Sequence, residues 1–428
     1  MTTKLIKNVR LFDPGSGVDE ENRSILITDS EISSLDAKNE QAADLVIDGK
    51  GLLCVPGFVD MRVHFCQPGG SRRETIATGC AAAAKGGFTT VCLMPTTEPT
   101  LDKVEIVEFV LGQARAAGTT RVLPVGAVSV DRKGERLSEI AKLTAAGCVA
   151  FSDGDHVIRD SQLLRYALET ASELGVLVIT HPQDEYLALG GVMHEGVIST
   201  KLGLGGIPAA AEVVGVSRDL AVAAMTGCRL HLSHISTAES VDLIRQAKKN
   251  GVLVTAEVSP LHLVLTDEAV LGYNTSAKLF PPLRPQADVE AVRRGLADGT
   301  IDAVATDHLP QTQLDKNTEF DRAADGAIGL ESCLGIILGL VKSGDLTLER
   351  AISVLTRGPA QILGHQDIGR LREKGLADLT LISLDGETPF TEDEIVSKSC
   401  NSPWLGNNLI GEVVLTVAAG EITYQRDK

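Results

Sequence analysis

The chain has 428 residues, of which 43% are hydrophobic and 23% are charged, a composition typical of globular proteins rather than disordered or fibrous ones. Its formal net charge of −17 argues against nucleic acid or an anionic membrane surface as a partner. No stretch approaches the roughly 20 apolar residues of a membrane-spanning helix, and the N-terminus does not resemble a signal peptide. The 8 scattered cysteines, without CxxC pairs, predict reduced thiols in a cytoplasmic protein.

The two ends of the chain share a pattern that predicts one small domain. Residues 1–55 contain short alternating segments such as KLIKNVRLF and RSILITDSEISSLD, separated by turn residues. Residues 366–428 contain similar segments, ADLTLISLDG and GEVVLTVAAGEITYQ. We therefore expect a composite β-sandwich built from both termini, with a larger domain inserted between them.

Residues 56–365 alternate short apolar runs with helical patterns, which is typical of βα units and a parallel sheet. One such helix is expected at ESVDLIRQAKKNG, which has helical apolar spacing and a glycine at its end. The pattern predicts an α/β fold, a (β/α)8 TIM barrel, and a doubly wound open sheet is the alternative. The expected strands are GFVDMRVH, FTTVCLMP, RVLPVGAV, GCVAFSD, GVLVITH, CRLHLSH, GVLVTAEV and IDAVATD.

Reactive side chains stand at the ends of several of these runs, where a barrel of this kind gathers its catalytic groups. Neutral imidazoles and carboxylates together suit Zn²⁺. Each residue alone could be an ordinary buried histidine or a capping carboxylate, but their joint placement favours a metal site or the remains of one. The run-ending residues are His64, Asp153, His181, His234 and Asp307.

Arg62 breaks this pattern, because it lies two residues before His64 on the same face of the first strand. A guanidinium is always cationic and cannot bind a metal ion. The first strand therefore carries either a damaged metal site or one that never held metal.

Sequence blocks in consistent order resemble dihydroorotases, especially the type I branch of the amidohydrolase superfamily. The resemblance implies a barrel enzyme of pyrimidine biosynthesis that hydrolyses a cyclic amide C–N bond with the help of bound metal. The matching blocks include PGFVDMRVH, ETIATGCAAAAKGGFTTVCLMP, GCVAFSD, LGLGGIPAAAEVVGVSRD, SHISTAESVDLIRQAKKNG, VTAEVSPLHLVLTDE, KLFPPLR, GTIDAVATDH and NSPWLGNNLIGEV.

The same resemblance implies the metal ligands. The family's first strand normally ends in His-x-His, which here reads Arg62-Val63-His64, and one metal would use that pair with Asp307. A second metal would use His181 and His234, and Asp153 would bridge both ions. Only the second set is complete, so we expect at most one zinc ion, or a metal-free protein. Asp307 would shuttle the proton if activity remains.

The substrate contacts implied by the resemblance are replaced. Cys66 and Thr96 stand where the family grips the carboxylate of dihydroorotate with Arg and Asn. Phe280 replaces an Asn, and Gln311 replaces the final His of the eighth-strand loop. Together, these losses would forfeit roughly 4 to 6 kcal/mol of substrate binding.

Three functions remain open. The favoured one is a catalytically degenerate, dihydroorotase-like structural partner of aspartate carbamoyltransferase, in a homo- or hetero-oligomer, because the framework blocks persist while the substrate contacts are lost. The second is a hydrolase with one metal ion acting on a neutral cyclic amide or imide, and the third is retained dihydroorotase activity. The polar segment 310–327 is expected to form a mobile loop over the barrel mouth.

Overall fold

The structure is a computed structural model that describes residues 2–37 and 43–426. It confirms the predicted (β/α)8 barrel, with all eight expected strands present and each paired in parallel with its neighbour in the chain. A bridge between Val63 and His308 brings the first and last strands together, and the His64 N–H donates to the His308 carbonyl at 2.9 Å. The barrel strands are β6 (Phe58–Val63), β7 (Phe88–Leu93), β8 (Arg121–Gly126), β9 (Ala150–Phe151), β10 (Leu177–Thr180), β13 (Leu230–Leu232), β14 (Val254–Val258) and β15 (Ala303–Val304).

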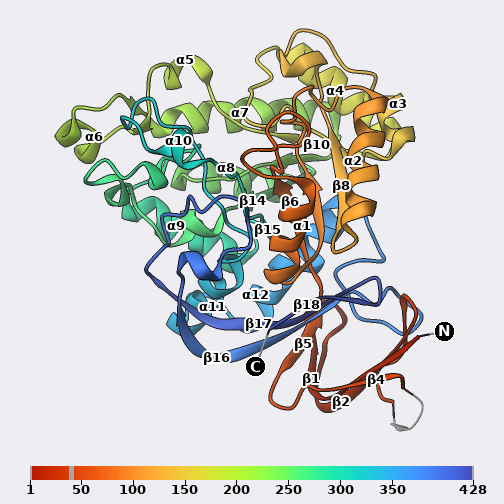
Figure 1. Ribbon diagram of the computed structural model, residues 1–428. Coiled ribbons are helices and arrows are strands. Elements are labelled where there is room, and N and C mark those ends of the chain that lie inside the picture. The colour runs from red at the N-terminus through yellow and green to blue at the C-terminus, as the bar shows by residue number, and fades with distance from the viewer. Residues whose placement is uncertain (1, 38–42, 427–428) are drawn as a thin grey trace.

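Helices pack around the barrel strands (Figure 1). The helix expected at ESVDLIRQAKKNG is α8 (Ala238–Lys249), whose N-terminus is capped by the Thr237 side chain accepting from the Ser240 N–H. Two lysines in its last turn complement the helix dipole. The other principal helices are α1 (Ile76–Lys85), α2 (Val104–Ala117), α3 (Ile140–Ala146), α4 (Ser161–Glu173), α7 (Ala209–Thr226), α9 (Gln286–Asp298), α11 (Cys333–Ser343), α12 (Leu348–Leu355) and α13 (Arg357–Leu363).

An excursion between β10 and α7 leaves the barrel wall. It contains α5 (Glu185–Ala188) and α6 (Val197–Leu202), together with β11 (Met193–His194) and β12 (Gly206–Ile207), which pair with each other. Figure 1 shows α5 and α6 at the outer edge of the molecule, beyond α7. No helix within the described residues is long and apolar enough to cross a membrane.

The terminal strands join in a second sheet, so both chain ends contribute to one β-rich domain, as predicted. Its two halves meet where β16 pairs antiparallel with β5, with Leu379 opposite Pro56. The described strands of this domain form one hydrogen-bonded sheet in the order β18-β17-β16-β5-β1-β2-β3, with β4 beside β1. Residues 1, 38–42 and 427–428 of the predicted terminal domain lie outside the described residues. The strands are β1 (Thr3–Asp13), β2 (Val18–Thr28), β3 (Glu31–Ser34), β4 (Leu45–Asp48), β5 (Leu53–Pro56), β16 (Leu379–Pro389), β17 (Asn408–Ala418) and β18 (Glu421–Gln425).

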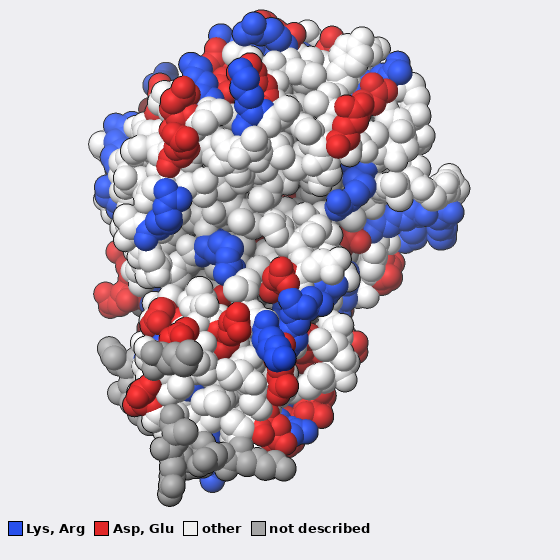
Figure 2. Space-filling view, turned by 90° about the vertical axis from the view of Figure 1, so that its right-hand side faces the viewer, with Lys and Arg blue, Asp and Glu red and all other residues white. Residues whose placement is uncertain are grey.

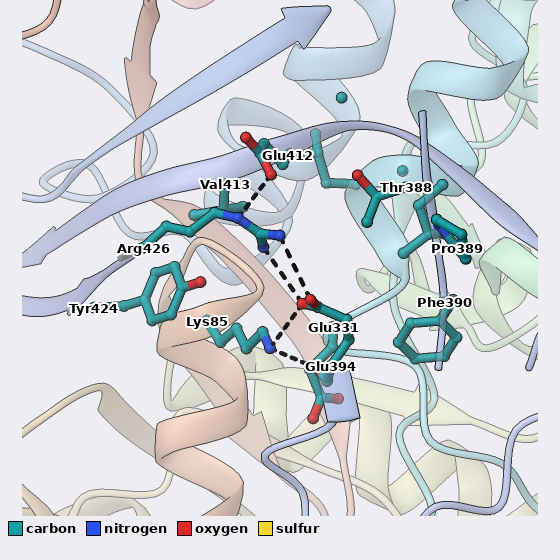
Figure 3. A pocket seen from close by; sticks show the side chains of 14 residues that line it. Lys85, Glu331, Thr388, Pro389, Phe390, Glu394, Glu412, Val413, Tyr424 and Arg426 are labelled. Carbon is teal, nitrogen blue, oxygen red and sulfur yellow. Dashed lines mark hydrogen bonds and ion pairs between the residues drawn. The ribbon is translucent and has the colours of Figure 1, made fainter. Parts of the chain in front are cut away.

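An ionic cluster fastens the C-terminal strands to the barrel (Figure 3). Arg426 contacts Glu412 at 2.9 Å and Glu394 at 3.3 Å, and Lys85 at the end of α1 contacts Glu394 at 3.2 Å. The cavity beside this cluster is small, about 50 Å³. Because α1 runs away from the barrel mouth, its last residue lies at the far end of the barrel, and this cavity is separate from the mouth. Charges of both signs are interspersed over the face in Figure 2.

Candidate functional site

The barrel mouth collects the side chains that follow the parallel strands. His64 follows β6, His181 follows β10, His234 follows β13 and Asp307 follows β15, as the run-ending positions predict. His234 and Asp307 have left-handed backbones, with φ of 36° and 51°. Left-handed backbone conformations are costly for residues other than glycine, and they are common at functional sites. Their occurrence at two residues of the mouth is therefore typical of an active site.

Arg62 lies at the centre of this mouth, with only 1% of its side chain exposed. Its Nε donates to Asp307 Oδ1 at 2.8 Å, its Nη2 donates to Asp155, and its Nη1 lies 3.4 Å from Ser233 Oγ. Burial alone lowers the pKa of the guanidinium, but Asp155 and Asp307 raise it further than burial lowers it. The side chain therefore points into the mouth as a permanent cation between two carboxylates.

The Arg62 cation lowers the pKa values of both carboxylates. Burial raises the pKa of Asp155 and of Asp307, but the adjacent Arg62 outweighs it and holds both below their usual range. His64 adds to this effect on Asp307, with its Nε2 at 3.6 Å from Asp307 Oδ1. Both acids are therefore ionised at neutral pH, and the guanidinium is their counter-ion.

Asp155, rather than Asp153, is the carboxylate from the fourth strand that reaches Arg62. Asp153 is held by Ser129, whose N–H and hydroxyl both donate to it, the N–H at 2.9 Å. Strand β9 ends at Phe151, and the chain then makes a turn at Gly154 that places Asp155 at the mouth. Asp155 is not among the site residues that the sequence predicts. The two aspartates in FSDGD were its only signal, and the sequence does not show which one Ser129 engages.

The histidines of the second metal set lie together. The ring centroids of His181 and His234 are 4.8 Å apart, and the ring of Phe280 lies 4.8 Å from that of His181. Burial lowers the pKa of His181 to about 4 and that of His234 well below its usual value. Both rings are therefore neutral, and both nitrogens of His181 and Nε2 of His234 have no hydrogen-bond partner.

More charge lies beneath Arg62 inside the barrel. Glu257 on β14 is 1% exposed, and the Nε2 of His231 lies 3.2 Å from its carboxylate. Asp60 on β6 accepts hydrogen bonds from the Arg62 N–H and from Thr306, while burial raises its pKa to about 7. Glu257 also raises the pKa of Arg62, so the barrel interior helps to keep the buried guanidinium charged.

A cavity of about 190 Å³ opens at the mouth. Its walls carry the carboxylates of Asp155, Asp307 and Asp325, together with the Phe280 ring and His262. Both nitrogens of His262 are occupied, by Ser259 Oγ at 2.8 Å and the Pro281 carbonyl at 2.9 Å. Phe280 narrows the space above His181, which leaves a compact chamber with acidic walls.

The other altered positions, Thr96, Cys66 and Gln311, do not line this chamber and do not replace the lost contacts. Thr96 Oγ1 lies 2.6 Å from Nδ1 of His64. Cys66 is buried with φ of 55°, and burial raises the pKa of its thiol to about 11, so it is not a ready nucleophile. Gln311 donates to the Asp325 carbonyl at 2.7 Å and lines a different cavity.

The segment 310–327, expected as a mobile loop, is anchored. It contains the short helix α10 (Gln313–Lys316). Two buried lysines donate to backbone carbonyls: Lys278 to Ala323 at 2.7 Å, and Lys316 to Ala324 at 2.7 Å and Thr275 at 3.0 Å. A polar composition predicts a surface loop, but it does not reveal lysines that satisfy that loop's carbonyls.

Lys316 gives this anchor a pH dependence. Burial lowers the pKa of Lys316 in the folded protein to about 8, whereas its pKa in the unfolded chain is about 10.4. Below pH 8 the folded protein must keep a charged lysine in a buried place, which lowers the free energy of unfolding. Between pH 8 and 10.4 this destabilisation decreases, because the folded protein loses the proton before the unfolded chain does. We expect the free energy of unfolding of the wild type, relative to Lys316→Met, to rise by up to about 3 kcal/mol between pH 8 and 10.4. Urea unfolding across that range measures it. A pH-independent difference would contradict it, and Lys342→Met, an exposed lysine, is the control.

Comparison with known proteins places this geometry in a family. A "Dihydro-orotase-like" family model matches residues 51–240, and an "Amidohydrolase family" model matches residues 207–424. A dihydroorotase of Anaeromyxobacter dehalogenans is 45% identical over 99% of this chain and 98% of its own length. The chain belongs to the dihydroorotase family. A dihydroorotase of Pelotomaculum thermopropionicum is 46% identical over 98% of both chains.

Solved structures agree with the family's fold. The L-hydantoinase of Arthrobacter aurescens matches with a TM-score of 0.88 and 26% identity, covering 100% of this chain and 97% of its own. The dihydropyrimidinase of Brevibacillus agri matches with a TM-score of 0.84 at 21% identity, covering 99% and 95%.

Dihydroorotases and their amidohydrolase relatives generally depend on metal, and the residues of this mouth meet only part of that requirement. The unpartnered nitrogens of His181 and His234 suit a metal ligand. The carboxylates do not, because Arg62 already neutralises Asp155 and Asp307. Within residues 2–37 and 43–426, no group of three or more His, Cys, Asp or Glu side chains is placed to hold one ion. With Arg62 in this position, the residues do not fit the family's metal centre.

Proposed function

We propose that the chain is a dihydroorotase-family protein of pyrimidine biosynthesis whose barrel no longer hydrolyses dihydroorotate. The position of Arg62 carries this proposal. A guanidinium between Asp155 and Asp307 repels a divalent cation and occupies the carboxylates that such a cation needs. It also keeps Asp307 from acting as a general base, because a carboxylate held by a cation is a weak base.

The chemistry of the cavity supports the same conclusion. Dihydroorotate carries a carboxylate, whereas the chamber walls carry three acidic side chains and the Phe280 ring. No arginine stands at Cys66 and no asparagine at Thr96 to grip that carboxylate in the family's manner. Loss of a charge-assisted contact alone weakens binding by roughly 10-fold or more.

We further propose that the retained scaffold serves in the cytoplasm as a structural partner of aspartate carbamoyltransferase. This part rests on the resemblance to type I dihydroorotases and on the preservation of the framework blocks around an altered mouth. Buried side chains support the intact scaffold, since Phe58, Phe88 and Phe151 have 0% exposure in the barrel core.

One coupled experiment tests both parts. The purified chain is assayed for zinc content and dihydroorotate hydrolysis, alone and mixed with aspartate carbamoyltransferase, while the transferase is followed by activity and sedimentation. We expect no stoichiometric zinc, no turnover and a mixed assembly that the transferase needs for full activity. Stoichiometric metal with ordinary turnover would overturn the first part. A transferase that is fully assembled and active alone would overturn the second.

A second candidate is a hydrolase with one metal ion acting on a neutral ring. The buried, unpartnered nitrogens of His181 and His234 favour it, since such groups usually have a partner. Turnover of dihydrouracil or hydantoin by zinc-loaded protein, abolished by a chelator, would establish this candidate in place of the first.

A further inference from the structure

A second cavity, of about 410 Å³, lies beside the anchored segment 310–327. Its walls come from three separate parts of the chain: Arg72 in the loop after β6, Gln311 and Lys316 in the anchored segment, and Lys398 in the segment that follows β16. None of its lining residues lines the chamber at the mouth, so the two cavities are separate. Its volume is within the range of roughly 300 to 1,000 Å³ that small-molecule sites occupy.

The walls of this cavity carry more positive than negative charge. Arg72, Lys316 and Lys398 line it, whereas Glu392 is its only acidic lining residue among those that the structure describes. The chain has a formal net charge of −17, so this concave surface has the opposite sign from the protein's overall charge. A concave wall with an excess of one sign of charge raises the local concentration of a ligand of the opposite sign. The cavity therefore favours an anion.

Two of the three cations can donate hydrogen bonds to such an anion. Arg72 is exposed, and its guanidinium makes no hydrogen bond or ion pair with any described residue. The Lys398 ammonium donates to the Ser71 carbonyl at 2.6 Å, which leaves two of its three N–H groups for a ligand. Asp315 does not neutralise Arg72, because its carboxylate accepts from the N–H and the hydroxyl of Thr312, at 3.0 and 2.7 Å.

The segment that carries Lys398 is held in place. The Lys398 N–H donates to the buried carboxylate of Glu74 at 3.2 Å, and the Ser399 hydroxyl donates to the Arg73 carbonyl at 2.7 Å. Glu74 and Arg73 follow Arg72 in the loop after β6. These contacts therefore hold the backbones of Arg72 and Lys398 side by side, and the two cations are positioned by the fold.

Lys316 and Gln311 contribute differently. The Lys316 ammonium donates to three backbone carbonyls, so it adds charge to the wall rather than a hydrogen bond. Gln311 is only 5% exposed, and its Nε2 donates to the Asp325 carbonyl at 2.7 Å. Its Oε1 is buried and accepts no hydrogen bond from the described residues. Because buried amide oxygens rarely lack a donor, this atom marks a place for an O–H group of a ligand.

We propose that this cavity binds a small phosphate monoester that also carries hydroxyl groups, a ligand of the sugar phosphate class. A phosphate monoester carries a charge of about −1.5 to −2 at neutral pH and three acceptor oxygens, which match Arg72 and Lys398 better than a singly charged carboxylate does. Inorganic phosphate alone leaves most of the cavity unfilled, whereas a sugar hydroxyl can donate to Gln311. The site does not depend on whether the barrel hydrolyses dihydroorotate.

Calorimetry at constant ionic strength, with ribose 5-phosphate, inorganic phosphate and ribose as probes, tests this proposal. We expect ribose 5-phosphate to bind roughly 10-fold more tightly than inorganic phosphate, and ribose not to bind. Arg72→Gln and Lys398→Gln should each weaken the binding of ribose 5-phosphate by roughly 10-fold, the value of one charge-assisted hydrogen bond. Arg322→Gln is the matched control and should bind as the wild type does. It removes the same charge from segment 310–327, but Arg322 is 74% exposed and does not line the cavity.

Gln311→Leu tests the second contact. It should abolish the preference for ribose 5-phosphate over inorganic phosphate without changing the affinity for inorganic phosphate, and an unfolding curve establishes that the variant is folded. A preference that survives this substitution would overturn the role of Gln311.

Absence of binding by ribose 5-phosphate at about 10 mM, or an unchanged affinity in both Arg72→Gln and Lys398→Gln, would overturn the proposal. A competition experiment excludes the barrel mouth as the binding site, because dihydroorotate should not displace ribose 5-phosphate, and displacement would also overturn the proposal. Hydrolysis of dihydroorotate by the wild type would overturn only the proposed function, since the two cavities share no lining residue.

Discussion

Replacement of Arg62 by Met is expected to lower the free energy of unfolding by roughly 3 kcal/mol, because it leaves two partly buried carboxylates without their counter-ion. Asp307 and Asp155 both contact the guanidinium, and Asp60 and Glu257 lie beneath it. Urea unfolding at neutral pH measures the change. We attribute the expected loss of stability to the missing charge, because Met retains much of the apolar length of the arginine side chain.

Two further variants identify the cause. Adding Asp155→Asn and Asp307→Asn to Arg62→Met should recover much of the lost stability, because the cost comes from unpaired charge and not from lost packing. Arg159→Met is the control. Arg159 pairs with Glu185 at the surface, with 61% and 43% of the two side chains exposed, so its loss should cost less than about 1 kcal/mol.

Asp155 and Asp307 also predict that the stability difference between the wild type and Arg62→Met depends on pH. The folded pKa values of Asp155 and Asp307 lie below their ordinary values, so their contribution is complete above about pH 4. As pH falls from there toward the folded values, the difference between wild type and Arg62→Met should shrink. A difference that stays constant down to pH 2, or a variant as stable as the wild type, would show that Arg62 is not the mouth's resident cation.

The barrel could be predicted from the sequence because its signals are local. Each strand is an apolar run followed by helical spacing, and the position where a run ends sets which side chain reaches the mouth. His64, His181, His234 and Asp307 were found this way, and the structure places all four at the mouth.

The finer features depend on contacts between segments far apart in the chain. Asp153 and Asp155 are equivalent by sequence pattern, and only the Ser129 contact separates them. Tertiary contacts of this kind are not encoded in periodicity.

Replacing the altered residues by those of the family tests whether these positions alone account for the expected loss of dihydroorotate turnover. The variant with Arg62→His, Cys66→Arg, Thr96→Asn and Gln311→His is expected to recover dihydroorotate turnover only weakly in zinc-containing buffer. The structure gives the reason: Phe280 lies 4.8 Å from His181 and lines the chamber that the substrate ring must enter. Gln311 should contribute least, because it faces another cavity.

A fifth substitution, Phe280→Asn, is expected to raise kcat/KM for dihydroorotate by roughly 10-fold or more over the four-residue variant, the value of one oriented hydrogen bond at the site. Phe280→Leu in the same background is the control, since it keeps the apolar bulk and should give no such gain. The zinc content of each variant is measured separately, so that a failure to bind metal is not mistaken for a blocked ring site. Equal activity of the four- and five-residue variants would mean that Phe280 does not obstruct the substrate. In that case the decisive change lies at Arg62, where a protein side chain supplies the positive charge between Asp155 and Asp307.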